Sequence, residues 1–220
     1  MSCLCAAAVT GYPVTALLRG RDLDTEAGNP GAKPLWQSGR MHPEAWLVVI
    51  DPQRIFASPD SEWGSPMFPG IVEPVRRLAS AAGERTVVTR WVPAAEPQGS
   101  WEAYMRAWPF ADVAHDDPLL DLVPEVHGLS DTVVSLPTFG KWGYALQAVT
   151  GPLPHLVLAG VSTDCCVVST ALAAADAGAT ITVVTDACAG STPENHAAAM
   201  KVMSLYPPQI TLATADELLR

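Results

Sequence analysis

Short apolar runs alternate with helix-length segments along the chain from residue 46 onward. Strands are predicted at 46–51, 85–92, 131–136, 155–160, 179–185 and 209–213, and helices at 70–82, 144–150, 164–177 and 194–205. Continuous apolar runs are typical of strands that are buried on both faces, and their alternation with helices favours a parallel sheet. The pattern therefore predicts an α/β fold with three layers, α/β/α, around a mostly parallel, Rossmann-like sheet of about six strands.

The first 44 residues differ from the rest of the chain. Glycine and proline recur in them, and neither a helical nor a strand period is sustained. We expect residues 1–44 to be a mobile N-terminal extension and 45–220 to form one domain. The extension is not a typical secretory leader, because no basic residue precedes its apolar stretch and Gly11 and Pro13 interrupt it. Met41 stands just before the first strand and is our hypothesis for the true start.

Composition excludes several classes of partner. The formal net charge is −10 with only 13 Lys and Arg residues, which argues against nucleic acid and anionic membranes. No apolar run is long enough to span a bilayer. The five cysteines show no regular spacing, and Cys3 and Cys5 lack the partners of a zinc site, so we expect a reducing, cytoplasmic location and no metal. We also expect a small-molecule substrate, no cofactor, and a homo-oligomer, dimer or tetramer.

Three polar residues stand where chemistry is expected. An apolar run breaks at Gly160 and restarts as a helix with Cys165 and Cys166 in its first turn. Unpaired N–H groups and the helix dipole there favour the thiolate, which would lower the cysteine pKa and supply donors for an oxyanion. Asp51 closes an apolar strand, and Lys141 lies in an aromatic, glycine-containing loop. Each alone has an ordinary alternative: a buried small thiol, a turn residue or a solvated charge.

In the order Asp, Lys, Cys, these segments together resemble the isochorismatase-like cysteine hydrolases, a superfamily that includes nicotinamidase and N-carbamoylsarcosine amidohydrolase. The resemblance covers roughly residues 45–215. Its most specific part is Gly-Val-Ser-Thr-Asp-Cys-Cys-Val at 160–167, followed by Asp-Ala-Cys-Ala-Gly at 186–190. The aspartate and lysine motifs support it by their order and spacing.

The resemblance implies a catalytic triad of Asp51, Lys141 and Cys166. It makes the second of the two adjacent cysteines the nucleophile, because the family places that residue two positions after the aspartate and directly before the valine. It also implies a cis peptide at Val161–Ser162 and an oxyanion hole formed by the backbone N–H groups of Ser162 and Cys166. On the sheet, all three triad residues are expected at the carboxyl ends of neighbouring strands.

The implied reaction is hydrolysis of a small, non-peptide, amide-type C–N bond through a thioester. Cys166 would attack the carbonyl, and Asp51 would take the thiol proton and return it to the leaving nitrogen. Metal-dependent nicotinamide hydrolysis is disfavoured, because no histidine occurs between His42 and His115. Two alternatives stay open: ester or vinyl-ether hydrolysis on the same fold, and a non-catalytic small-molecule-binding or thiol-redox protein.

The substrate pocket is expected to be aromatic. Its predicted wall residues are Gln53 and Phe56, which follow Asp51 in the family's pattern, and Trp91, Trp101, Tyr104 and Trp142, with Trp108, Phe139 and Tyr144 as further candidates. Arginines 54, 90 and 106 are available for a substrate carboxylate. Packing of long loops is the alternative explanation for each aromatic residue.

Further expectations concern His196, the two ends of the helix predicted at 164–177, and the adjacent cysteines. His196 could act as a base but is more simply a structural histidine on its helix. Asp164 is expected to cap the helix that follows it, which should end at Gly178 as the C′ residue. A vicinal disulfide between Cys165 and Cys166 would be strained and would imply redox regulation.

Overall fold

The structure is a computed structural model that describes residues 41–220. Most of the predicted N-terminal extension, with Cys3 and Cys5, lies outside the described residues. Six strands form a single sheet in the order β3-β2-β1-β4-β5-β6, and every neighbouring pair is parallel. The strands are β1 (Trp46–Ile50), β2 (Thr86–Trp91), β3 (Val133–Leu136), β4 (His155–Val161), β5 (Thr180–Ala189) and β6 (Ile210–Ala213). The predicted α/β fold with a Rossmann-like sheet is confirmed.

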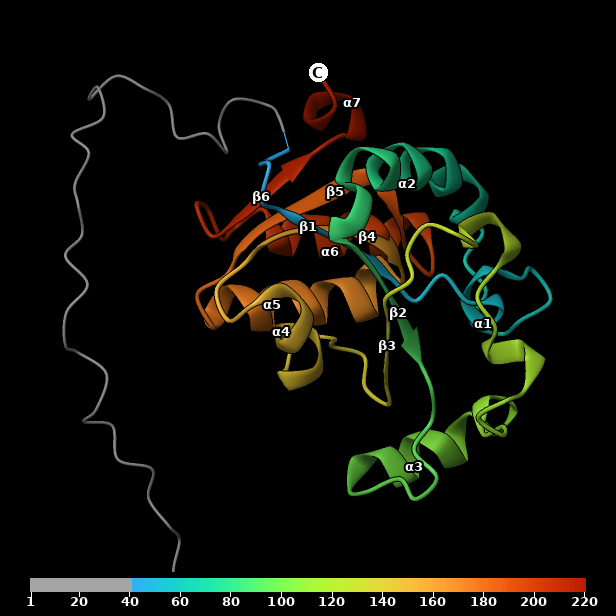
Figure 1. Cartoon of the computed structure of the whole chain (residues 1–220). Coiled ribbons are helices and arrows are strands. Elements are labelled where there is room, and N and C mark those ends of the chain that lie inside the picture. Colours follow the sequence, from blue (N-terminus) through green and yellow to red (C-terminus); the bar gives the residue numbers. More distant parts are fainter. Residues whose placement is uncertain (1–40) are drawn as a thin grey trace, which may run out of the picture. The chain divides into compact units, whose positions relative to one another are not determined.

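Helices cover both faces of the sheet (Figure 1). One face carries α2 (Phe68–Ala82) and α7 (Ala215–Leu218); the other carries α4 (Tyr144–Thr150), α5 (Val168–Asp176) and α6 (Pro193–Met203). Side chains of β1 alternate between the two faces, as the strand period requires. Val48 and Ile50 join the cluster under α5, whereas Leu47 and Val49 join the cluster under α2. Burial on both faces explains why this strand reads as continuously apolar.

The long connection between β2 and β3 differs from the sequence prediction. It contains α3 (Ser100–Ala107), which was not predicted, because a helix of two turns shows too little of its period to be recognised. Figure 1 shows α3 beyond the carboxyl ends of β2 and β3. Short elements complete this region and the connections around it: α1 (Arg54–Ala57), η2 (Gly83–Arg85), η3 (Pro109–Ala111), η4 (Pro118–Leu120) and η5 (Pro124–Val126).

The helix predicted at 164–177 begins as a π-helical turn, η6 (Thr163–Val167), which continues into α5. A π-helical turn is uncommon and is often found at functional sites. The far end of α5 follows the prediction: Gly178 has a φ of 97°, and its N–H donates to Ala175 O at 2.9 Å while that of Ala179 donates to Ala174 O at 3.0 Å. These two bonds form a Schellman motif with glycine at C′.

The centre of the sheet is also where its connections reverse direction, since β1 lies between β2 and β4. The strands approach closely there: Gly160 has a φ of 113°, and a Cβ at this position would overlap the backbone of Ile50. In open parallel sheets, ligands bind at the carboxyl ends of the strands beside such a reversal point. None of the helices formed by residues 41–220 is long and apolar enough to cross a membrane.

Candidate active site

Asp51 stands at the carboxyl end of β1 and is completely buried. Its φ is 46°, an uncommon conformation for a residue with a side chain, which turns the carboxylate away from the strand direction. Thr89 on the neighbouring strand β2 fixes it from the side. The Thr89 hydroxyl donates to Asp51 Oδ1 at 2.7 Å, and the Asp51 backbone N–H lies 3.2 Å from the same hydroxyl oxygen. The sequence reasoning missed Thr89, because β2 also contains Thr86 and Arg90 and so does not mark one polar position.

Lys141 is the charge partner of Asp51. It comes from the loop between β3 and α4, is also completely buried, and places Nζ 2.9 Å from Asp51 Oδ2. The ammonium donates a second bond to Thr138 O at 2.7 Å. Asp51 Oδ2 has no other hydrogen-bond partner among the described residues. This oxygen is therefore held by the ion pair but keeps the capacity to accept a proton.

Cys166 lies in η6, one turn after the end of β4. The register that pairs Ile50 with Gly160 brings the end of β1, and so Asp51, beside the start of η6. A short chain of bonds also ties the lysine loop to the cysteine: the Lys141 N–H donates to Thr170 Oγ1 at 2.9 Å, and the Thr170 hydroxyl donates to Cys166 O at 2.7 Å. The structure thus brings together the three residues that the sequence singled out.

The turn around Cys166 contains the predicted cis peptide, although it is π-helical instead of α-helical. The peptide bond between Val161 and Ser162 is cis, and the Val167 N–H donates to Ser162 O at 3.1 Å, which closes the π-helical turn. Ser162 and Cys166, whose N–H groups are the predicted oxyanion donors, both line one cavity. Cys165 and Cys166 are free thiols, so the vicinal disulfide is not formed.

The protonation of Cys166 differs from the sequence prediction. The hydrogen bond with the Cys165 thiol, together with burial and the negative charge of Asp51, raises the pKa of Cys166 well above its usual value, and Lys141 only partly opposes this. The sequence suggested a lowered pKa from the helix start alone. Burial and a neighbouring carboxylate outweigh that effect, because both disfavour the thiolate. The raised pKa favours the thiol form of Cys166, so a reaction through the thiolate would require a base nearby.

A cavity of about 360 Å³ is lined in part by Cys166. Six aromatic rings form most of its wall: Phe56, Trp63, Trp91, Tyr104, Trp108 and Phe139. The polar part of the wall consists of Glu62, Ser162, Asp164, Cys165, Cys166 and Ser191. Burial, together with the two nearby thiols, raises the pKa of Tyr104 to about 12, so its phenol is neutral at physiological pH.

Three of the six predicted wall residues, Phe56, Trp91 and Tyr104, line this cavity; Gln53, Trp101 and Trp142 do not. The amide of Gln53 is fully used inside the protein, because its Nε2 donates to Trp91 O at 2.9 Å and to Leu120 O at 2.7 Å, while its Oε1 accepts from the Trp91 N–H at 2.7 Å. Gln53 is therefore a structural clamp between β2 and η4.

The other two residues lie behind or outside the wall. Trp101 packs against Tyr104 and Phe139, with ring centroids 5.4 and 4.7 Å apart. Trp142 packs against the core cluster beneath α5. Tyr144, a further candidate, is 88% exposed. Their positions depend on how the loops fold over one another, which the order of residues does not reveal.

Trp63 was missed by the sequence reasoning, although its ring is the centre of the aromatic wall. Its centroid lies 6.0 Å from Phe56, 5.4 Å from Trp91 and 5.7 Å from Trp108. The residue belongs to the irregular segment between α1 and α2, where neither a helical nor a strand period exists. No local signal distinguished it from an ordinary loop tryptophan.

The three candidate arginines do not line the cavity. Arg54 faces a separate surface cavity beside η4 and η5. Arg90 donates to Leu120 O through Nε at 3.3 Å and through Nη2 at 3.1 Å. Arg106 is exposed and pairs with Glu102 at 3.7 Å. None of the three arginines therefore belongs to the wall of this cavity.

His196 and Asp164 have structural partners. His196 Nδ1 lies 2.9 Å from Thr163 Oγ1, and the histidine does not line the cavity. Asp164 does not cap its own helix. Its two oxygens accept from the backbone N–H and the hydroxyl of Ser191, each at 2.7 Å, and so tie η6 to the segment after β5.

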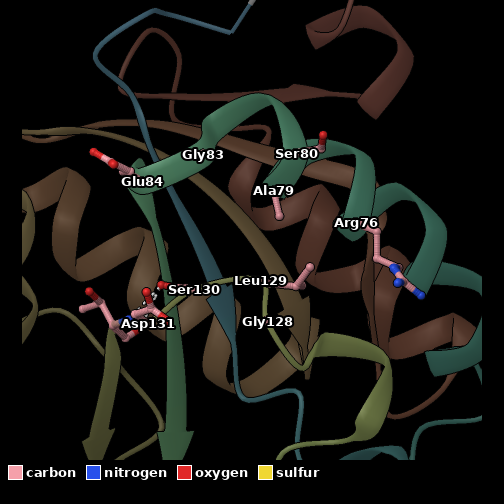
Figure 2. Close-up of a pocket in the computed structure, with 10 residues that line it drawn as sticks. Arg76, Ala79, Ser80, Gly83, Glu84, Gly128, Leu129, Ser130 and Asp131 are labelled. Atoms are coloured by element: carbon pink, nitrogen blue, oxygen red, sulfur yellow. Dashed lines mark hydrogen bonds between the residues drawn. The ribbon is translucent and has the colours of Figure 1, made fainter.

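A second cavity, of about 650 Å³, lies near the amino ends of β2 and β3 (Figure 2). Arg76, Glu84 and Asp131 are the charged residues of its lining, which contains no cysteine or histidine. It holds none of the three residues brought together at the other edge of the sheet, so the cavity beside Cys166 is the candidate active site. Among residues 41–220, no group of three or more His, Cys, Asp or Glu side chains could hold a metal ion.

Comparisons with known proteins agree with this architecture. A family model described as the isochorismatase domain matches residues 45–217. A cysteine hydrolase from Pseudomonas syringae pv. phaseolicola has a similar structure, with a TM-score of 0.70 and 16% identity over 82% of this chain and 93% of that one. An isochorismatase family protein from Desulfovibrio vulgaris subsp. vulgaris matches with a TM-score of 0.65 and 20% identity, and the match covers 79% of this chain and 95% of that one. PnC1 from L. infantum, solved in complex with nicotinate, matches with a TM-score of 0.61 and 15% identity, and the match covers 81% of this chain and 97% of that one. No curated protein matches the chain.

Proposed function

The chain belongs to the isochorismatase family, and from that premise we propose that it is a cysteine-dependent hydrolase that cleaves a small, non-peptide C–N bond through a thioester. One observation carries the proposal. A completely buried ion pair, Lys141 Nζ to Asp51 Oδ2 at 2.9 Å, lies beside a thiol whose residue, Cys166, lines a cavity. A buried ion pair costs desolvation free energy, so its presence next to a nucleophile favours a chemical role over a stabilising one.

In the first half-reaction, Cys166 Sγ attacks the substrate carbonyl carbon. Because the raised pKa keeps this thiol protonated, Asp51 Oδ2 accepts its proton as the S–C bond forms and the carbonyl electron pair moves onto oxygen. The N–H groups of Ser162 and Cys166 are the proposed donors to that oxyanion, each contributing about 3–4 kcal/mol by the usual magnitude. Asp51 then returns the proton to the nitrogen, the C–N bond breaks, and the amine leaves.

In the second half-reaction, water replaces the amine. Asp51 accepts a proton from the water as its oxygen attacks the thioester, and returns that proton to the Cys166 sulfur as the acid leaves. Lys141 stays charged throughout and offsets the charge of Asp51, while the Thr89 hydroxyl holds the other carboxylate oxygen at 2.7 Å. General acid–base catalysis of this kind contributes about 10²- to 10⁴-fold to a rate.

The test is an ammonia-release screen of the full chain over small amides, ureido acids and carbamoyl amino acids. We expect at least one compound to release ammonia with the wild type and with Cys165→Ala, and none with Cys166→Ala. Mass spectrometry of the quenched wild-type reaction should show the acyl group on Cys166. The same compounds as esters and vinyl ethers form the second panel. Turnover confined to that panel would replace the amide assignment. No turnover in either panel, combined with peroxide oxidation of both Cys165 and Cys166, would favour a thiol-redox protein.

Two further proposals concern the setting of the enzyme. We propose a cytoplasmic location, supported by the unpaired thiols at 165, 166 and 188. We also propose a homo-oligomer of two or four copies. Sedimentation of the full chain at several concentrations measures the assembly directly, and a concentration-independent monomer would contradict it.

A further inference from the structure

The charges around the candidate cavity have one sign. Glu62 and Asp164 are the charged residues of its lining, and none of the described residues that line it is positive. Lys141, whose positive charge acts on Cys166, is completely buried and paired with Asp51. The whole chain adds to this imbalance with a net charge of −10. A field of this sign attracts cations and repels anions.

An anionic substrate group would be poorly accommodated here. A carboxylate taken from water into an aromatic cavity needs a positive partner or several donors. Arg90 and Arg106 are engaged elsewhere, and Arg54 faces a different cavity. The part of the substrate that does not react therefore carries no negative charge.

The aromatic wall offers a positive recognition element. Trp63 meets Trp91 at an interplanar angle of 70° and Trp108 at 66°, and all three residues line the cavity. The faces of aromatic rings carry negative potential, and a cation placed within about 6 Å of several ring centres gains about three- to thirtyfold in affinity. Tryptophan is the most effective of the aromatic side chains in this interaction.

Glu62 completes the arrangement. It directly precedes Trp63, lines the cavity and is exposed to solvent, so it can serve as a counter-charge at the cavity mouth at little desolvation cost. Asp164 is already held by two hydrogen bonds from Ser191. A carboxylate beside a set of tryptophan and tyrosine rings is the arrangement that recognises alkylated ammonium groups.

From the one-signed charge and the aromatic wall, we infer that the substrate is an amide whose non-reacting part carries an ammonium group, held by the rings around Trp63 with Glu62 as its counter-charge. This inference rests on the proposed function for the reacting end of the substrate, whose carbonyl meets Cys166. Recognition of the ammonium group itself requires no catalysis, so the two proposals are tested separately.

The probes are choline and its uncharged carbon isostere 3,3-dimethylbutan-1-ol, titrated calorimetrically into the full chain. We expect choline to bind at least tenfold more tightly than the isostere. Glu62→Gln should weaken choline about three- to fivefold and leave the isostere unchanged, with Glu102→Gln on α3 as the matched surface control that changes neither. Trp63→Leu should abolish the preference for the charged probe.

Equal or weaker binding of choline overturns the inference, as does a preference that survives both Glu62→Gln and Trp63→Leu. Repeating the titration with Cys166→Ser separates this result from the chemistry. If choline is preferred but no amide is hydrolysed, the proposed function fails while cation recognition stands. If the screen yields only neutral or anionic amide substrates and choline is not preferred, the hydrolase proposal stands and the substrate class is wrong.

Discussion

The buried pair between Asp51 and Lys141 allows the sharpest test of the site, through the variants Asp51→Asn, Lys141→Met and the double variant. Both wild-type side chains are completely buried and lie 2.9 Å apart. Each single change leaves one full charge inside the protein without its partner. The double change removes both charges, keeps a group that can bond to Thr89 at position 51, and fills the volume of the lysine stem with methionine.

The expected magnitudes follow from the loss of one partner of a buried pair, which typically costs about 3–5 kcal/mol in the free energy of unfolding. For a chain of this size, 1 kcal/mol corresponds to about 2–4 °C, so each single variant should lose about 6–20 °C in Tm. Replacing both members of a buried pair with neutral groups of similar volume is often close to neutral. We therefore expect the double variant to cost at least about 3 kcal/mol less than the sum of the two single variants.

The measurement is urea denaturation followed by tryptophan fluorescence, combined in a double-mutant cycle with turnover assayed on the same samples. All three variants should be inactive, including the stable double variant, because each lacks the base, its charge partner or both. Additive costs would mean that the two charges are not coupled in solution, which would refute the geometry. Near-normal turnover of the double variant would remove both residues from the mechanism.

Three other predictions concern separate features. Cys166→Ala should lower turnover by about 10⁴-fold or more with the fold retained, whereas Cys165→Ala should keep most of the activity. Cys165→Ala should also move the iodoacetamide reactivity of Cys166 to lower pH, since the hydrogen bond between these thiols raises the pKa of Cys166. Reversed effects of the two variants on turnover would exchange their roles. Burial and the neighbouring His42 lower the pKa of His155 from 6.5 to about 4, so the contribution of His155 to stability is complete above pH 6.5 and is lost as the pH falls toward 4. In thermal melts between these pH values, His155→Gln should lose about 1–2 kcal/mol less than the wild type, allowing for partial solvent screening. An unchanged pH dependence in the variant would contradict this. Gly160→Ala should lower the free energy of unfolding in urea by about 3 kcal/mol or more, because the added Cβ would overlap the backbone of the neighbouring strand. In the control Gly70→Ala the added Cβ meets no atom within 4 Å, so this variant should be neutral or slightly stabilising. Similar results for both variants would show that the strands can move apart.

Several features of the fold and site could be predicted from the sequence because they depend on local pattern. Continuous apolar runs located the central strands β1 and β4, since a strand buried on both faces is apolar at nearly every position. Glycine at 178 predicted the end of α5 because that position requires a positive φ. The order and spacing of Asp51, Lys141 and Cys166 pointed to one edge of the sheet, because parallel strands direct their carboxyl ends the same way.

Other features depend on which segments meet in space, and only the tertiary structure decided them. Gln53 and Trp63 are examples: the first is used up by hydrogen bonds to β2 and η4, and the second is the centre of an aromatic wall built from four separate segments. The protonation of Cys166 is another, since its pKa is raised by its neighbour's thiol, by burial and by Asp51 on a different strand. Hydrogen-bond satisfaction, cavity walls and electrostatic environment are sums over long-range neighbours, whereas the periodicity of a sequence reports only which face of each element is buried.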